Sequence, residues 1–124
     1  MKLTYFRAYG RAEAIRMLLH HSKTNYENKY VKFGDLPALK ASGELPNGQI
    51  PIFEIEGRVL NQSVPILRTL GALKGYYNKN DAFAAYDADW VISTVDDTFT
   101  PDFYKTFMSP MSADEKCVTD KIAR

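Results

Sequence analysis

The chain has 124 residues and a mass of 14.1 kDa, a length that fits one domain and part of a second. Hydrophobic residues make up 45% and charged residues 25%, which is typical of a globular protein and excludes a disordered or fibrous one. The formal net charge of +1 argues against nucleic acid as a partner, and no apolar run reaches the roughly 18 residues of a membrane span.

The first part of the chain begins with a strand, a helix and a second strand. Residues 2–6 end in β-type residues and predict a short strand, which Gly10 terminates. Residues 11–21 place their apolar side chains on one stripe and predict a helix. A second strand is expected over residues 26–32. A helix between two strands predicts that the strands run parallel.

A long connection and a hairpin follow. Residues 33–49 are rich in Gly, Pro, Asn and Ser and predict an irregular segment, with a short helix near residues 36–41. Two β-type runs, residues 51–55 and 58–60, lie on either side of Glu56-Gly57. This arrangement is typical of an antiparallel hairpin with a short turn.

A third helix is expected to begin at Ser63. Serine is a favoured N-cap, and Pro65 lies in the first turn, where a missing N–H costs nothing. Gly71 and Gly75 weaken and then end the helix. The order β-α-β-(α)-β-β-α predicts an α/β domain over residues 1–75 with a mixed four-stranded sheet.

The rest of the chain predicts a short all-α segment over residues 81–124, after a linker at residues 75–80. From Asp81 a long amphipathic helix is expected, which Pro101 ends or kinks. Ser112 and Glu115 resemble a capping box for one last helix. The apolar side chains of the long helix form one stripe: Phe83, Tyr86, Trp90, Val91, Val95 and Phe99. This stripe needs a cover, and a partner protein is expected to supply it.

Charge is unevenly distributed along the chain. The first 74 residues hold 11 Lys and Arg against 6 Asp and Glu, whereas the last 50 hold 5 against 9. The basic part suits an anionic small molecule and the acidic part a partner subunit, although both are also consistent with solvated surfaces. The single cysteine, Cys117, excludes an internal disulfide and a cysteine zinc site, and a cytoplasmic location is expected.

Common catalytic patterns are absent from the sequence. The two histidines, His20 and His21, are adjacent at a helix end, where a structural or dipole role is favoured over a triad or a metal site. No metal is expected, and no glycine-rich phosphate loop occurs. A different group of residues is expected to converge at one end of the sheet, where helix N-termini favour the binding of anions. The members of this group are Tyr5, Arg11, Gln49, Ile50, Pro51, Gln62 and Ser63.

These residues carry a resemblance to a known family. Residues 3–13 read LTYFRAYGRAE, and residues 34–37, 49–52 and 60–63 read GDLP, QIPI and LNQS. In this order and spacing they resemble the opening of sigma-class glutathione transferases over residues 2–74 and, less extensively, the helix from Asp81. The resemblance implies a thioredoxin-like first domain, followed by a truncated helical domain, and glutathione as co-substrate with no metal.

The resemblance also implies a role for individual residues. Tyr5 matches the catalytic tyrosine whose hydroxyl donates to the sulfur of glutathione, although by itself it reads as a strand aromatic. A free thiol has a pKa near 8.5, and a hydrogen bond to the thiolate lowers it. The Ile50–Pro51 bond matches a cis-proline turn whose Ile50 backbone pairs with the cysteinyl segment.

Further positions match residues that contact the ends of glutathione. Gln62 and Ser63 correspond to residues that hold the γ-glutamyl group, and Gln49 belongs to the same site. Lys40 matches a residue near the glycine carboxylate; Arg11 is counted with the site, although a structural role is favoured for it. Asp89 aligns with an aspartate that reaches across a dimer interface, and a solvated helix face is the alternative.

Two departures from the family pattern bear on function. The family usually has an aromatic residue at the position of Leu36. Its members run to about 200 residues, so much of the pocket wall for an electrophile is expected to be missing from these 124 residues. The expected function is conjugation of glutathione to electrophilic small molecules by a homodimer or a subunit of a larger complex. The alternative is a non-catalytic, glutathione-transferase-like structural subunit.

Overall fold

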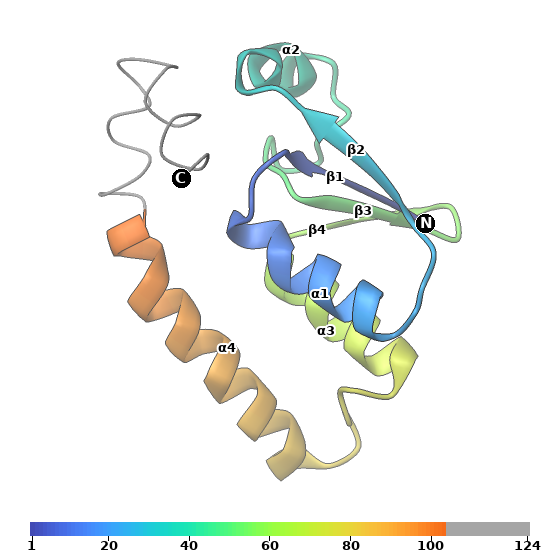
Figure 1. Ribbon diagram of the computed structural model, residues 1–124, viewed down its shortest axis with the longest axis vertical. Helices are drawn as coiled ribbons and strands as arrows, with labels where there is room; N and C mark the ends of the chain where they lie inside the picture. The colour runs from blue at the N-terminus through green and yellow to red at the C-terminus, as the bar shows by residue number, and fades with distance from the viewer. Residues whose placement is uncertain (104–124) are drawn as a thin grey trace. The chain divides into compact units, whose positions relative to one another are not determined.

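The structure, a computed structural model, describes residues 1–103, with side chains described through residue 97. The chain divides into two compact units, Met1–Lys79 and a second that starts at Asn80. Figure 1 shows the sheet of the first unit and the long helix that the described residues of the second unit form. The residues that resemble glutathione transferases most closely lie in the first unit.

The first unit is built on a four-stranded sheet. The strands are β1 (Lys2–Phe6), β2 (Glu27–Val31), β3 (Ile52–Ile55) and β4 (Arg58–Asn61), and they lie in the order β2-β1-β3-β4 (Figure 1). β1 pairs in parallel with β2 and antiparallel with β3, and β3 pairs antiparallel with β4. The mixed sheet and the thioredoxin-like α/β fold are therefore confirmed.

Helices and helical turns connect the strands where the sequence pattern predicts them. α1 (Glu13–His21) follows a 3-10 turn at Gly10–Ala12, and α2 (Leu36–Ala41) follows another at Phe33–Asp35. α3 (Ser63–Lys74) closes the unit and ends at Gly75, whose left-handed φ of 80° suits glycine. The short helix predicted in the long connection is thus confirmed.

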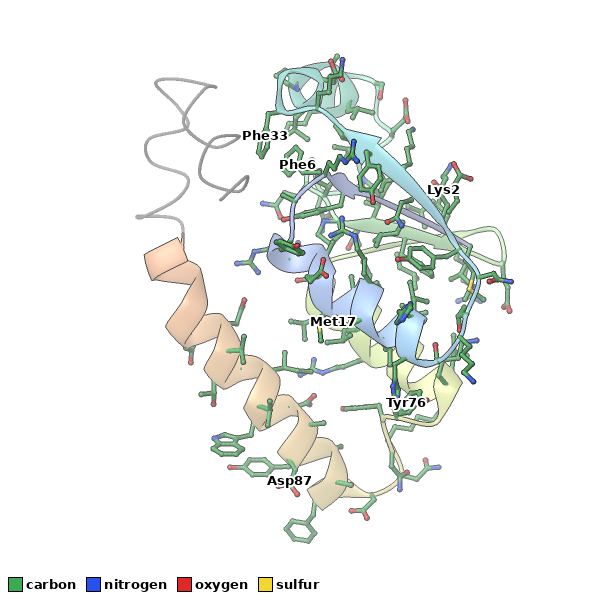
Figure 2. The ribbon with its side chains drawn as sticks, viewed as in Figure 1. Lys2, Phe6, Met17, Phe33, Tyr76 and Asp87 are labelled. Carbon is green, nitrogen blue, oxygen red and sulfur yellow. The ribbon has the colours of Figure 1, made fainter. Side chains whose placement is uncertain are left out.

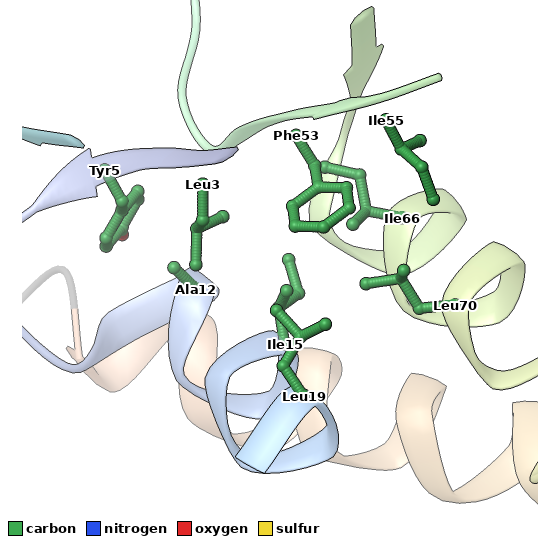
Figure 3. Close-up of a cluster of buried hydrophobic side chains, with 9 residues drawn as sticks. All are labelled: Leu3, Tyr5, Ala12, Ile15, Leu19, Phe53, Ile55, Ile66 and Leu70. Atoms are coloured by element: carbon green, nitrogen blue, oxygen red, sulfur yellow. The ribbon is translucent and has the colours of Figure 1, made fainter. Parts of the chain in front are cut away.

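α1 and α3 lie side by side against one face of the sheet (Figure 1). Because strand side chains alternate between faces, Leu3 and Tyr5 point toward these helices, whereas Thr4 faces the side that carries Leu39 and Leu45. Figure 3 shows side chains of β1, β3, α1 and α3 meeting in one core. Its buried members are Leu3, Tyr5, Ala12, Ile15, Leu19, Phe53, Ile55, Ile66 and Leu70.

α3 begins at Ser63, as predicted, but its cap is a different residue from the one expected. Ser63 is the first helical residue and not the N-cap; Gln62 occupies the cap position, and its carbonyl accepts the Ile66 N–H at 3.1 Å. Gln62 has φ 66° and ψ 122°, a conformation that the sequence gives no reason to expect. Pro65 is the third helical residue, so its missing N–H leaves no helical hydrogen bond unmade.

The second unit contains α4 (Ala82–Phe103), which confirms the long helix predicted from Asp81. The Asp81 carboxylate caps it by accepting the N–H groups of Phe83 and Ala84 at 3.0 and 3.1 Å. The helix continues through Pro101, so that proline does not end it. The last helix predicted near residues 112–115 lies outside the described residues. Among the helices described, none has the length and hydropathy needed to cross a membrane.

Candidate active site

The sheet register brings three of the predicted site residues to one edge of the sheet, the edge at which β1 and β4 end and β3 begins. Thr4 pairs with Ile52, and Ile52 pairs with Asn61. Tyr5 directly follows Thr4, Pro51 directly precedes Ile52, and Gln62 directly follows Asn61. Since β3 runs antiparallel to both of its neighbours, all three residues come at the same end of the sheet.

Tyr5 lies at this edge with its ring in the core and 8% of its surface exposed. Its hydroxyl oxygen accepts the backbone N–H of Arg11 at 3.2 Å. Gly10 lies against the same hydroxyl: a Cβ at this position would come 2.8 Å from the oxygen, and φ is +52°. Gly10 therefore allows the β1–α1 loop to fold closely over the tyrosine hydroxyl.

The Gly10→Ala variant is expected to lower the free energy of unfolding by about 2 kcal/mol, measured by urea denaturation. About 1 kcal/mol comes from the left-handed φ, and about 1 kcal/mol from displacing the Tyr5 hydroxyl from the Arg11 N–H. Gly43→Ala is the matched control, because Gly43 has φ +76° with nothing within 4 Å of an added Cβ. Equal losses in the two variants would contradict the role of the Tyr5 contact.

The turns before β3 and after β4 meet beside Tyr5. The Ile50–Pro51 peptide bond is cis, as the resemblance implies. The Gln62 side-chain amide donates to the side-chain oxygen Oε1 of Gln49 at 3.3 Å, so these two predicted residues touch. The positive φ of Gln62 places a sparsely populated backbone conformation at this junction, and such conformations cluster at functional sites.

The remaining predicted residues are distributed around this junction. Lys40 lies in the last turn of α2, and its side chain packs near Gly48, the residue before Gln49. A Cβ added at Gly48 would lie 3.9 Å from the Lys40 Cγ. Ser63 is half-buried at the first position of α3. Arg11 contributes its backbone N–H to Tyr5. Asp89 lies on α4 in the second unit, and its role at the site stays a prediction.

Two features of this loop region were not predicted from the sequence. Arg16 of α1 donates to the carbonyl oxygens of Ala8 and Phe6 at 2.8 and 3.1 Å. The Phe6 ring stacks on Phe33 with centroids 3.9 Å apart (Figure 2). The i,i+3 spacing of Glu13 and Arg16 indicates an ion pair, and the structure has it at 2.8 Å. The same spacing gives no indication that Arg16 also donates to carbonyl groups of the loop.

The chemistry of the edge suits an anionic ligand. The N-terminus of α3 presents unpaired helix N–H groups and the positive end of the helix dipole. Lys40, whose side chain lies near Gly48, adds positive charge next to Gln49, and the Tyr5 hydroxyl is both a donor and an acceptor. Among the described residues there is no cluster of three or more His, Cys, Asp or Glu side chains suited to a metal ion.

Comparison with known proteins gives a consistent result. The family described as "Glutathione S-transferase, N-terminal domain" matches residues 1–70. Hematopoietic prostaglandin D synthase of Gallus gallus is 35% identical over 77% of this chain and 47% of its own length. Glutathione S-transferase 1 of Ascaris suum is 41% identical over 63% of this chain and 37% of its own length.

A solved structure resembles the whole chain. The glutathione S-transferase from Ascaris lumbricoides has 30% sequence identity and a TM-score of 0.75, and the match covers 99% of this chain and 58% of that one. The chain thus spans about half the length of the curated relatives that it matches. The family model that matches residues 1–70, more than half of the chain, gives one conclusion: the chain belongs to the glutathione transferase family.

Proposed function

We propose that the chain binds glutathione and acts as a sigma-class-like glutathione transferase that conjugates the thiolate to electrophilic small molecules. The observation that carries the proposal is the Tyr5 hydroxyl, held by the Arg11 N–H at 3.2 Å at the sheet edge beside Pro51 and Gln62. The names of the relatives support it, since they include glutathione S-transferases and a prostaglandin D synthase. Isomerisation would use the same thiolate.

Tyr5 would act by stabilising the ionised thiol. A free thiol with a pKa near 8.5 is only a few per cent ionised at pH 7. A hydroxyl that accepts the Arg11 N–H is polarised and becomes a better donor to the sulfur, so the pKa of the thiol falls. The thiolate then forms a C–S bond with the electrophile, whose leaving group departs with the bonding electron pair, and the thiol proton passes to solvent.

The rest of the edge would hold the tripeptide. Ser63 and the first N–H groups of α3 are suited to the γ-glutamyl carboxylate, with Gln62 and Gln49 beside them. Lys40 would take the glycine carboxylate as a point charge. The Ile50 backbone before cis-Pro51 would pair with the cysteinyl peptide group.

Calorimetric titration with glutathione tests the proposal. The wild-type chain is expected to bind, and Ser63→Ala to bind about 10-fold more weakly, because a hydrogen bond to a carboxylate is lost. Thr69→Ala is the matched control, since Thr69 is an exposed hydroxyl on the same helix. Unchanged affinity in Ser63→Ala would remove that residue from the site. A wild-type chain that does not bind millimolar glutathione would favour the alternative, a non-catalytic structural subunit.

We also propose that the protein is a cytoplasmic homodimer or a subunit of a larger assembly. The support is the apolar stripe of α4, where Trp90 and its neighbours on the same face are exposed. Membership in the family supports the location and the assembly in general terms. The exposed members of the stripe are Phe83, Tyr86, Trp90, Val91 and Val95.

A further inference from the structure

The Arg16 side chain makes several hydrogen bonds around the β1–α1 loop. Its guanidinium donates to the Ala8 carbonyl and the Glu13 carboxylate at 2.8 Å each, and to the Phe6 carbonyl at 3.1 Å. A longer contact of 3.5 Å reaches the Asn28 side chain on β2. Only 13% of the Arg16 side chain is exposed. A guanidinium this buried, with these hydrogen bonds to the loop and to Glu13, is held in one orientation.

The two carbonyls that Arg16 binds lie in the segment between the tyrosine and its hydrogen-bond donor. Phe6 directly follows Tyr5, and Ala8 precedes Gly10 by two residues. The next residue along, Arg11, supplies the N–H that the Tyr5 hydroxyl accepts. The guanidinium therefore sets the path by which the chain leaves Tyr5 and returns over its hydroxyl.

Arg16 also lies close to the tyrosine ring itself. Its guanidinium carbon is 5.8 Å from the Tyr5 ring centroid, within the range of a cation–π contact. It is 5.9 Å from the ring of Tyr30, the register partner of Tyr5 on β2. The same group thus contacts the strand, the loop and the ring that together present the hydroxyl.

We propose that Arg16 is a positioning residue: it fixes the Phe6–Gly10 loop so that the Arg11 N–H meets the Tyr5 hydroxyl. The effect of Arg16 on glutathione chemistry rests on the proposed function; its effect on the loop does not. Lysine has no planar fork and cannot replace all the donors at once, so Arg16→Lys is expected to restore only part of the arrangement.

The loop is tested in the 124-residue chain without ligand by amide hydrogen exchange measured with NMR. Arg16→Gln is expected to reduce protection of the Arg11 amide by about 10-fold or more, because an N–H in an opened loop exchanges with water. Amides of β1 and β3 should keep their protection. In Arg16→Lys, the protection of the Arg11 amide should lie between that of the wild type and that of Arg16→Gln. Arg58→Gln is the matched control, since Arg58 is exposed at the opposite end of the sheet, beside the β3–β4 turn. Glu13→Gln, which keeps both carbonyl bonds, should have the smaller effect.

The second measurement is the kcat and KM of conjugation with 1-chloro-2,4-dinitrobenzene. Arg16→Gln is expected to lower kcat by about 10- to 100-fold through misplacement of the hydroxyl, with little change in the KM for glutathione. Unchanged Arg11 protection, or an equal loss of protection in the core amides, would overturn the proposal. If the wild-type chain shows no conjugation, the proposed function fails, and the exchange experiment alone decides the role of Arg16.

Discussion

The Tyr5→Phe variant is expected to conjugate glutathione to 1-chloro-2,4-dinitrobenzene about 100-fold more slowly than the wild type at pH 6.5. The variant retains the ring in the core and removes only the hydroxyl that the Arg11 N–H polarises. Below the pKa of a free thiol the rate follows the thiolate fraction, so losing the donor to sulfur reduces the rate directly. The initial rate at saturating glutathione is the measurement.

The matched control is Tyr30→Phe. Tyr30 is the register partner of Tyr5 on β2 and is 51% exposed, so the same atom is removed at the neighbouring position. Its rate is expected to stay within about 2-fold of the wild type, as for a surface substitution. Equal rates in wild type and Tyr5→Phe would remove Tyr5 from the chemistry. Retained glutathione binding in Tyr5→Phe would show that the loss lies in the reaction and not in the site as a whole.

Replacing Phe53 with alanine is expected to lower the free energy of unfolding of the first unit by about 3–5 kcal/mol. Phe53 is fully buried on β3, and its ring packs between the sheet and the residues of α1 and α3 (Figure 3). Removing it leaves a cavity that these helices cannot fill. Because a domain of this size has only about 5–15 kcal/mol of stability, much of the unit would unfold at moderate temperature.

Urea denaturation followed by far-ultraviolet circular dichroism measures this loss. The single tryptophan, Trp90, lies on α4 in the second unit, so its fluorescence is less suited to report on the first. Val59→Ala on the adjacent strand is the control, since Val59 is 49% exposed, and its expected loss is below about 1 kcal/mol. A loss of that size for Phe53→Ala would contradict the placement of this ring at the centre of the core.

Much of the fold follows from local pattern. Alternation and turn residues predict the hairpin at Glu56-Gly57, because that dipeptide provides the positive φ values that a tight turn requires. The apolar stripe that contains Ile15 and Leu19 predicts which face of α1 is buried. The mixed sheet follows from a β-α-β unit joined to a hairpin.

Other features depend on contacts that pattern does not encode. Gln62, the cap before Ser63, has a positive φ where β4 passes into α3, and its side chain contacts Gln49 there. The loop carbonyls that Arg16 binds are brought together only when α1 folds back along β1. Pro101 lies within α4, so of the two predicted effects of this proline, ending the helix is wrong. The individual roles predicted for the site residues of the first unit come from the family resemblance, because a strand tyrosine alone predicts no chemistry.

The most direct test of the central claim is the ultraviolet absorbance of the thiolate of glutathione bound to the wild-type chain and to Tyr5→Phe, titrated against pH. In the wild type, the midpoint is expected to lie well below the value near 8.5 of a free thiol. In Tyr5→Phe it is expected to return toward that value, since the hydroxyl no longer stabilises the charged sulfur. A midpoint that is the same in both proteins would contradict the account.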